Sequence, residues 1–424
     1  MKTKFQLRPY QMEAIDKAVT ILKRKGIVYI AGEIRTGKTL ISLFTAEDSF
    51  ANRVLFITKK KAIPSIQKDF SLHNFNFSLL VVSMDSLHKV IGEPDLVIVD
   101  EAHSFGSFPK PALRAKNLRK LLQRGPYANV IFLSGTPSPE SYSQFYHQFW
   151  AVNGGPWASY KNFYHWAKTF VDIQKKYIGN ARPVNDYSQV MDPDEILDAV
   201  KPYMVTLSQK DAGFNGTVKE TIMYLPTPTD VLEAMEEMKR EKVAYGNLLI
   251  ANTPAHLMTI YHQLASGTFK DRNGDFYWVN DFKARFIKKK FKGKKIAIFY
   301  NYIAEGLMLR EMFSLNTDSP EVFNSTNETM VFICQVTSGS QGVNLSSADF
   351  IIFFNISHSA TQYWQARGRS QTIDGGNKQV VWIFSDSGVE DDIYSVVKGK
   401  KKYTASHFTK FVREKEVGKQ LKMF

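Results

Sequence analysis

Twice along this chain, short and nearly continuous apolar runs alternate with helix-like stretches. The runs lie at 27–31, 54–58, 79–83, 96–100 and 130–134, and again at 295–300, 331–337, 350–355 and 379–384. Continuous rather than alternating hydrophobicity is typical of parallel strands that are covered on both faces. The intervening segments of the first half are long enough for helical crossovers. The sequence therefore predicts two α/β domains, each built on a doubly wound parallel sheet.

The stretch from about 140 to 290 interrupts this alternation. It is aromatic-rich and helix-like to about residue 177, passes a Pro- and Asn-marked loop at 182–186, and becomes a charged helix from Val231. The segment F-K-D-R-N-G-D-F-Y-W-V predicts a hairpin with Asn273 and Gly274 at its turn. We expect a first domain at 1–150, an accessory elaboration and helical linker with this hairpin at 151–290, and a second domain at 291–424.

Composition excludes several classes of protein. A length of 424 residues with 44% hydrophobic content predicts two or three folded domains. The one cysteine, Cys334, excludes a disulfide scaffold and a multi-cysteine zinc site. The N-terminal sequence lacks an apolar leader and no window approaches 18 apolar residues, so we expect a cytoplasmic protein that does not span a membrane. The net charge of +14 indicates a polyanionic partner, either nucleic acid or an anionic membrane face.

The most specific motif is G-E-I-R-T-G-K-T at 32–39, directly after a predicted strand and before a helical run. It fits G-x-x-x-x-G-K-[ST], in which glycines let the backbone approach phosphate oxygens. Gly32 and Gly37 would form the loop, Lys38 would reach the β- and γ-phosphates, and Thr39 would bind Mg²⁺. The alternative is an ordinary strand-to-helix turn that contains glycine.

A second motif, D-E-A-H at 100–103, follows the buried strand 96–99. Two carboxylates would then emerge at the carboxyl edge of the sheet, where α/β proteins bind ligands. Asp100 suits the metal and Glu101 suits the attacking water. Four residues alone could instead be a polar helix start.

With these residues in place, the chain resembles the superfamily-two helicases and translocases of DEAH type. It looks most like compact Swi/Snf-type DNA translocases and the branch-migration helicases of phages and bacteria. L-R-P-Y-Q at 7–11 is similar to the segment whose glutamine, here Gln11, reads adenine. S-G-T-P at 134–137 matches the segment that links hydrolysis to movement, which places Ser134 and Thr136, with His103, in coupling.

The resemblance continues into the second half and implies tandem RecA-like domains. I-A-I-F-Y-N at 296–301 looks like the opening strand of the family's second domain, and 337–345 resembles the segment that contacts DNA and nucleotide. W-Q-A-R-G-R at 364–369 resembles the arginine-finger helix. The resemblance implies ATP and Mg²⁺ as cofactors. It implies catalytic roles for Gln365 and Arg369, a nucleotide contact at Gly342, and nucleic-acid contacts at Thr58, Lys59, Ser83, Asn301 and Thr337.

Two positions depart from the family pattern. Arg35 replaces a glycine that is common in the Swi/Snf group, so the geometry of the phosphate loop can differ there. Thr372 occupies the place of a second finger arginine, so either Arg369 suffices, Arg367 contributes, or hydrolysis is slow. The finger arginines could also belong to a solvated basic helix face.

Positive charge is concentrated in two segments. Residues 283–295 carry eight Lys or Arg and no acid, and 398–424 carry nine basic residues against two Glu. Such clusters raise affinity for phosphates without reading bases. We expect binding by the first cluster, whereas the second is as well explained by solubility. The aromatic residues of 145–166 could stack on bases but, at helical spacing, are more typical of a core.

The leading hypothesis is an ATP-driven helicase or translocase on duplex, forked or branched DNA, with a role in fork remodelling, branch migration, recombination or repair. One alternative is an RNA helicase, suggested by the shared D-E-A-H box. Another is a nucleic-acid clamp that hydrolyses ATP weakly, suggested by Thr372. We expect a monomer, and the sequence names no loading partner.

Overall fold

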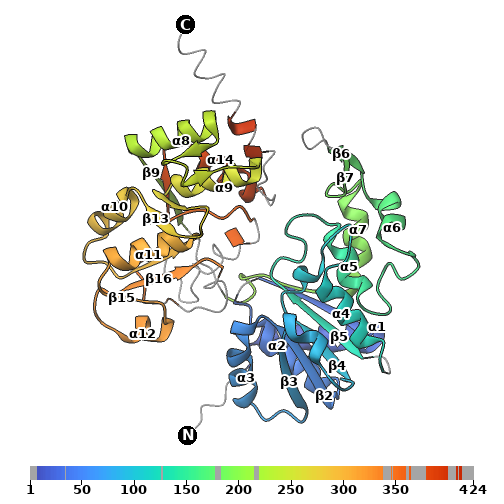
Figure 1. The fold of residues 1–424 in the computed structure, drawn as a ribbon. Coiled ribbons are helices and arrows are strands. Elements are labelled where there is room, and N and C mark those ends of the chain that lie inside the picture. Colours follow the sequence, from blue (N-terminus) through green and yellow to red (C-terminus); the bar gives the residue numbers. More distant parts are fainter. Residues whose placement is uncertain are drawn as a thin grey trace. The chain divides into compact units, whose positions relative to one another are not determined.

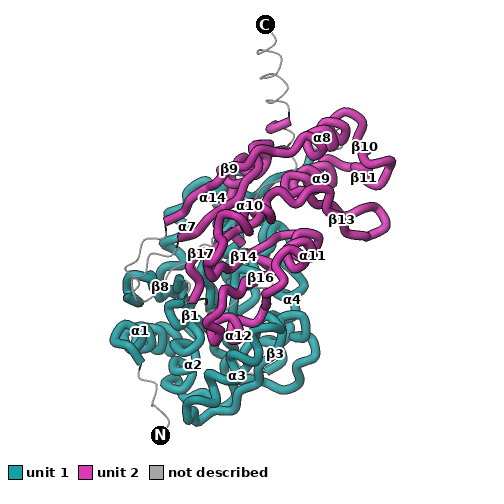
Figure 2. Tube along the Cα trace, turned by 90° about the vertical axis from the view of Figure 1, so that its left-hand side faces the viewer, with its two compact units in different colours: residues 1–214 teal, residues 215–424 magenta. Residues whose placement is uncertain are grey.

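The computed structural model describes residues 7–33, 35–125, 128–176, 183–213, 219–337, 345, 347–359, 362–363, 379–399, 407–408 and 410–412. The chain divides into two compact units, 1–214 and 215–424 (Figure 2). Each unit contains a six-stranded parallel sheet with helices on both of its faces (Figure 1). The predicted fold class, two tandem parallel-sheet α/β domains, is confirmed.

The sheet of unit 1 has the strand order β3-β2-β4-β5-β1-β8. Its strands are β1 (Ile27–Gly32), β2 (Arg53–Thr58), β3 (Ser78–Ser83), β4 (Leu96–Val99), β5 (Asn129–Ser134) and β8 (Met204–Leu207). The first five agree with the predicted runs to within about a residue. The sequence analysis did not predict β8, which pairs with β1 at the edge of the sheet.

Two hydrophobic clusters cover the two faces of this sheet. The helices of unit 1 are α1 (Pro9–Lys25), α2 (Lys38–Asp48), α3 (Ile63–Ser71), α4 (Leu113–Leu122), α5 (Gln144–Trp150), α6 (Phe163–Phe170) and α7 (Pro193–Val200). Helices α1 to α3 pack on one face and α4 to α7 on the other. Successive side chains of a strand point to opposite faces, so Val28 joins the first cluster and Tyr29 the second.

Short elements complete unit 1. They are the 3-10 turns η1 (Lys60–Ala62), η2 (Met84–Lys89), η3 (Ala102–Phe105) and η4 (Lys201–Tyr203), and the antiparallel pair β6 (Gln174–Lys176) and β7 (Val184–Asp186). The aromatic segment forms core, as its spacing indicates: Tyr146, Trp157 and Trp166 are buried. Tyr164 is an exception and is 43% exposed.

Unit 2 repeats the architecture with the strand order β15-β16-β14-β17-β18-β9. Its strands are β9 (Lys219–Leu225), β14 (Ile296–Tyr300), β15 (Asn316–Thr317), β16 (Val331–Gln335), β17 (Phe350–Phe353) and β18 (Gln379–Ser385). Its helices are α8 (Thr229–Glu241), α9 (Pro254–Leu264), α10 (Phe282–Lys290), α11 (Ile303–Met312), α12 (Pro320–Ser325) and α14 (Val389–Lys398). Helices α8, α9 and α14 cover one face, and α10 and α11 cover the other.

Two antiparallel pairs lie in unit 2, β10 (Val243–Ala244) with β11 (Leu249–Ile250) and β12 (Thr268–Lys270) with β13 (Phe276–Trp278). The second pair is the predicted hairpin, which is confirmed. Gly274 has φ of 102° in its turn, a value that favours glycine. Asp271 fixes the turn by accepting bonds from the backbone N–H groups of Asn273 and Asp275 at 2.9 and 2.8 Å.

The segment 151–290, predicted as an accessory elaboration, is divided between the two units. Strand β8 extends the first sheet and β9 extends the second, where it pairs in parallel with β18 over its whole length. Among the described residues, no helix is both long and apolar enough to cross a membrane.

Candidate nucleotide-binding and hydrolysis site

The phosphate loop connects the carboxyl end of β1 to the first residue of α2. Two residues of the loop have left-handed backbone: Arg35 has φ of 68°, and Gly37, the N-cap of α2, has φ of 75°. Glycine adopts this conformation without steric cost, whereas a side chain costs about 1 kcal/mol or more. The departure noted at Arg35 therefore keeps a backbone conformation suited to glycine.

Both loop glycines lie where a side chain would collide. A Cβ on Gly32 would lie 2.6 Å from Thr36 Oγ1 and 2.9 Å from Lys38 Cγ. A Cβ on Gly37 would clash with the side-chain amide of Gln11. The loop is therefore closed around bare backbone at the N-terminus of an eleven-residue helix, an arrangement that fits a phosphate group.

Lys38 lies across this loop. Its Nζ donates to the carbonyl oxygens of Gly32 and Glu33 at 2.7 and 3.0 Å. Burial lowers the pKa of Lys38, while the nearby carboxylates of Glu101, Asp100 and Glu33 raise it. A cation held beside bare backbone and three acidic side chains has the chemistry expected for a site that binds phosphate and metal together.

Asp100 follows β4 and is held by two hydrogen bonds. Its Oδ2 accepts from Thr58 Oγ1 at 2.8 Å, and its Oδ1 accepts from the backbone N–H of Glu101 at 2.9 Å. Burial, and then the charge of Glu101, raise the pKa of Asp100 to about 6. Carboxylate and hydroxyl oxygens are the ligands that Mg²⁺ prefers, so Asp100 and Thr39 fit the predicted metal. Their role as metal ligands stays a prediction.

Glu101 begins η3 with left-handed backbone, φ 49° and ψ 46°. Such backbone is uncommon for a residue with a side chain and often occurs at functional positions. Glu101 Oε2 lies 3.4 Å from His103 Nδ1, which is also 3.0 Å from Ser134 Oγ. Burial and the charge of Lys59 lower the pKa of His103 to about 4. A neutral imidazole therefore connects Glu101 to the S-G-T-P segment at neutral pH.

The S-G-T-P segment begins at the last residue of β5. Ser134 Oγ accepts from the backbone N–H of Thr136 at 3.1 Å. The hydroxyl of Thr136 is buried, and among the described residues it has no hydrogen-bond partner. Gln148 of α5 donates to Pro137 O at 2.9 Å and accepts from the Tyr29 hydroxyl at 2.8 Å. The segment is thus held from both sides of its turn, and the predicted coupling roles of His103, Ser134 and Thr136 remain predictions.

The N-terminal L-R-P-Y-Q segment packs on the phosphate loop. Gln11 is buried against Gly37, and its Oε1 accepts from the Arg8 backbone N–H at 3.0 Å. The Tyr10 hydroxyl donates to Thr36 O at 3.1 Å, a contact that the sequence analysis did not anticipate. This position beside the loop is consistent with the predicted nucleotide contact of Gln11.

The end of unit 1 also reaches this loop. Gln209, just after β8, donates its backbone N–H to Glu33 Oε2 at 2.6 Å. The Glu33 N–H donates to Leu207 O at 2.8 Å, and Arg8 Nη1 donates to Ala212 O at 3.0 Å. These contacts join positions about 175 to 205 apart in sequence, and no local motif indicates them.

The predicted nucleic-acid contacts of unit 1 lie at the same sheet edge. Thr58 and Ser83 are register partners at the ends of β2 and β3. The Thr58 side chain is fully buried against Asp100, and Ser83 Oγ caps η2 by accepting from the Ser86 N–H at 3.2 Å. Lys59 is half-buried. Contacts through the backbone, which the resemblance implies for 54–60, stay a prediction.

In unit 2, Asn301 and Thr337 follow β14 and β16 at the carboxyl edge of the second sheet. Asn301 is held by the buried carboxylate of Glu305, whose Oε2 accepts the Asn301 N–H at 2.8 Å. Gln335 Nε2 donates to Asn301 O at 3.0 Å. Gly342, Gln365 and Arg369, together with Arg367 and Thr372, lie outside the described residues.

One basic residue assigned to the nucleic-acid surface lies in the interior instead. Lys283 is 0% exposed, and its Nζ forms an ion pair with the equally buried Glu390 at 2.5 Å. The Lys283 side chain thus joins α10 to the start of α14. The expectation that the whole segment 283–295 binds phosphates was therefore wrong for Lys283.

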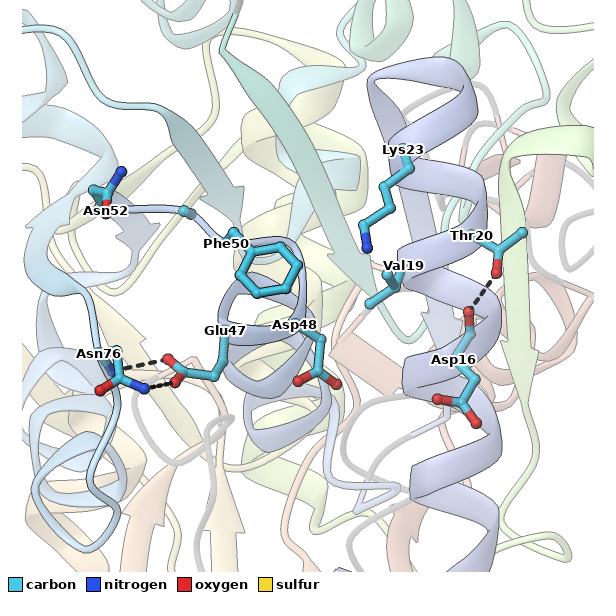
Figure 3. Close-up of a pocket in the computed structure, with 10 residues that line it drawn as sticks. Asp16, Val19, Thr20, Lys23, Glu47, Asp48, Phe50, Asn52 and Asn76 are labelled. Atoms are coloured by element: carbon cyan, nitrogen blue, oxygen red, sulfur yellow. Dashed lines mark hydrogen bonds between the residues drawn. The ribbon is translucent and has the colours of Figure 1, made fainter.

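A pocket of about 610 Å³ lies away from this site, at the other end of α2 (Figure 3). Asp16, Lys23 and Asp48 line it, and the exposed Phe50 lies at its edge with the Lys23 ammonium 5.2 Å from the ring centroid. An eleven-residue helix is about 16 Å long, so this pocket is separate from Lys38.

Comparisons with known proteins agree with the motifs. Residues 4–76 match the family model described as type III restriction enzyme, res subunit, and 314–373 match the helicase conserved C-terminal domain. A curated relative from Drosophila melanogaster is a SWI/SNF-related matrix-associated actin-dependent regulator of chromatin subfamily A-like protein 1. It is 21% identical over 446 residues, which cover 93% of this chain. The chain spans 55% of the length of that relative.

Two solved structures match the chain over most of its length. The Sulfolobus solfataricus SWI2/SNF2 ATPase core in complex with dsDNA has 16% identity and a TM-score of 0.43, with 93% of this chain and 91% of that chain covered. The Pyrococcus furiosus Hef helicase domain has 13% identity and a TM-score of 0.45, with 91% and 98% covered.

Proposed function

We propose that this chain is a superfamily-two helicase or translocase of Swi/Snf type, an ATP-driven motor that moves on duplex or branched DNA. The family supports ATP hydrolysis that depends on nucleic acid. The choice of DNA, and a setting in fork remodelling, branch migration, recombination or repair, are our proposal.

The observation that carries the proposal is the arrangement at the carboxyl edge of the first sheet. Lys38, Asp100 and Glu101 interact electrostatically, and Glu101 is connected through His103 to Ser134. One continuous set of contacts thus joins the phosphate- and metal-binding groups, the candidate base Glu101 and the S-G-T-P segment that is expected to link hydrolysis to movement.

Each residue has a chemical task in this proposal. Lys38 would exchange its two carbonyl partners for phosphate oxygens, and Gln11 would recognise the base beside the loop. Thr39 and Asp100 would hold Mg²⁺, which supplies charge neutralisation at the phosphates. Glu101 would orient the attacking water and accept its proton. His103, being neutral, would respond to a change at Glu101 by altering its contact with Ser134 rather than by taking up charge.

The resemblance assigns further residues, in the second half of the chain, to this function. Arg369, with Gln365, would stabilise the charge that develops on the transferred phosphoryl group, and such an arginine is typically worth about 10³ or more in rate. Gly342 would contact the nucleotide, and Asn301 and Thr337 would contact the DNA.

Support for DNA comes from the Swi/Snf-like segments of the second half and from the curated relative, a regulator of chromatin by its description. The net charge of +14 supports a polyanion without distinguishing DNA from RNA.

The test is an ATPase panel with single-stranded, duplex, forked and four-way DNA and with duplex RNA. We expect low basal hydrolysis, strong stimulation by duplex or branched DNA, and a loss of about 10² or more in kcat for Lys38→Ala and Glu101→Gln. Lys120→Gln, an exposed lysine of α4 with no assigned role, is the control and should behave as the parent. Indifference to every nucleic acid would contradict the proposal, and stronger stimulation by RNA would favour the RNA helicase.

A further inference from the structure

In the described part of unit 2, a cluster of exposed lysines without ion-pair partners lies at the end of α10. We define the lysine patch as Lys288, Lys289, Lys290, Lys292 and Lys294, all of which are exposed. Within the described residues, none of the five forms an ion pair. With Lys283 buried, the lysine patch is the part of the basic segment 283–295 that is available to a partner.

The lysine patch lies at the amino edge of the second sheet. Lys295, directly after it, precedes β14, and its N–H donates to Asp349 Oδ2 at 2.9 Å just before β17 begins. The predicted DNA contacts Asn301 and Thr337 lie after β14 and β16, at the carboxyl edge. A five-residue strand is about 17 Å long, so the two surfaces are on opposite edges of one sheet.

The scaffold beneath the lysine patch is packed into the core of unit 2. Ala284 and Ile287 of α10 and Phe291 just after it are buried in the core of unit 2. Lys288 Nζ donates to Met312 O at 2.9 Å, at the end of α11. The charges are therefore held on packed structure, which reduces the entropy lost when a partner binds.

Helix stabilisation explains the lysine patch in part. Cations in the last turn of a helix interact favourably with its dipole, which accounts for Lys288, Lys289 and Lys290. Lys292 and Lys294 lie beyond the end of α10 and have no such role. Five lysines in seven residues repel one another, and a polyanion would relieve that repulsion.

We propose that the lysine patch is a second nucleic-acid contact. It holds the phosphate backbone of a DNA segment at the edge of the second sheet opposite the predicted DNA contacts Asn301 and Thr337, which we call the track. The inference rests on the proposed function for the identity of the DNA. A duplex presents one charge per about 1.7 Å and requires only matching charge from its partner. A membrane would also require an apolar anchor, and the one apolar residue of 288–294, Phe291, is buried.

The test is the variant K289Q/K290Q/K292Q/K294Q, which leaves Lys288 with its bond to Met312 O. We expect duplex DNA to bind about tenfold or more weakly at 0.1 M salt, and the slope of log affinity against log salt to be shallower by about 3 to 4. The kcat of ATP hydrolysis at saturating DNA should be unchanged, because the track and the nucleotide site are intact.

The matched control is K161Q/K168Q/K175Q/K201Q, which removes the same charge from four exposed lysines of unit 1. It should retain the parent affinity and salt slope. A parent-like salt slope in the lysine-patch variant would overturn the proposal, and so would a collapse of kcat at saturating DNA, which would place these lysines in the motor's own track.

Two further outcomes separate this inference from neighbouring ones. Loss of binding to anionic phosphatidylserine vesicles with DNA binding intact would overturn the nucleic-acid assignment in favour of a membrane. If the parent ATPase ignores nucleic acid, the proposed function fails, while a change in DNA affinity and salt slope in the variant would still support the lysine patch as a DNA contact.

Discussion

At the scale of single residues, Thr58 shows how a side chain can serve a site without facing its ligand. The resemblance assigns it to the nucleic-acid surface, but its hydroxyl is buried and donates to Asp100 at 2.8 Å. A hydroxyl at the end of a strand can point to solvent or to the neighbouring strand, and the sequence is the same in both cases. The structure therefore adds a positioning role that sequence reasoning could not find.

We expect Thr58→Val to raise the Mg²⁺ concentration for half-maximal ATPase activity by about tenfold, because partners that orient a metal ligand are typically worth 10- to 100-fold in metal affinity. Thr58→Ser keeps the donor and should restore the parent value. Magnesium titrations of ATPase activity measure the effect, and circular dichroism checks the fold. Parent-like magnesium dependence in Thr58→Val would show that Asp100 needs no such support.

His103 connects two motifs through a single ring. We expect His103→Ala and Ser134→Ala each to raise the ATP consumed per base pair moved by about tenfold, since the link from Glu101 to Ser134 is lost in both. The double variant should be no worse than either single variant, because residues that act as one unit are not additive. Additive losses in a combined ATPase and translocation assay would instead assign the two residues independent roles.

At the scale of elements, continuous hydrophobicity predicted the central strands and the edge strand β3, whereas it missed the edge strands β8, β9 and β15. Strands β4 and β5 are buried on both faces, so nearly every residue is apolar. Strand β9 is half exposed, with the sequence K-E-T-I-M-Y-L, and β8 has four residues. An edge strand needs apolar residues on fewer sides, so its sequence can resemble a loop or a short helix. For that reason the segment 151–290, which contains β8 and β9, was interpreted as an accessory elaboration.

The ion pair between Lys283 and Glu390 gives a prediction at this scale. Lys283→Met should lower the free energy of unfolding of unit 2 by about 3 to 5 kcal/mol, because it leaves the Glu390 carboxylate buried without its counterion. K283M/E390Q should recover much of the loss, since both charges are gone. Hydrogen exchange of the β18 amides reports on this unit. Equal protection in the single and double variants would contradict the buried-charge explanation.

At the scale of the whole molecule, buried histidines make stability depend on pH. Burial lowers the pKa of His103, His147 and His358 to about 4. Unfolding returns each to about 6.5, so between these values the unfolded chain binds more protons than the folded one. The stabilisation is therefore complete above pH 6.5 and is lost as the pH falls toward 4, by about 1.4 kcal/mol per pH unit for each histidine.

Asp100 offsets part of this effect, because its pKa is raised to about 6 and its contribution changes with pH in the opposite direction. We expect a net fall in the urea concentration at the unfolding midpoint between pH 6.5 and 4.5. His147→Gln should make the pH dependence shallower. A flat profile over this range would show that these histidines are protonated in the folded state.

The site could be predicted from sequence where function depends on neighbours in the chain, and much less where it depends on contacts between distant segments. The phosphate loop and D-E-A-H are local patterns in a recognisable context, and the structure places Lys38, Asp100 and Glu101 together as those patterns indicate. The support of Asp100 by Thr58 and the burial of Lys283 are tertiary facts. They arise from the packing of whole elements, which a single sequence does not display.

The contacts of Glu33 with Leu207 and Gln209 bear on how unit 1 could act as a machine. The chain leaves unit 1 just after residues that are hydrogen-bonded to the phosphate loop itself, at 2.8 and 2.6 Å. A shift of the loop backbone would therefore also move the segment after β8, through which the chain continues out of unit 1. The phosphate loop and the segment that leads out of unit 1 are thus mechanically coupled through Glu33.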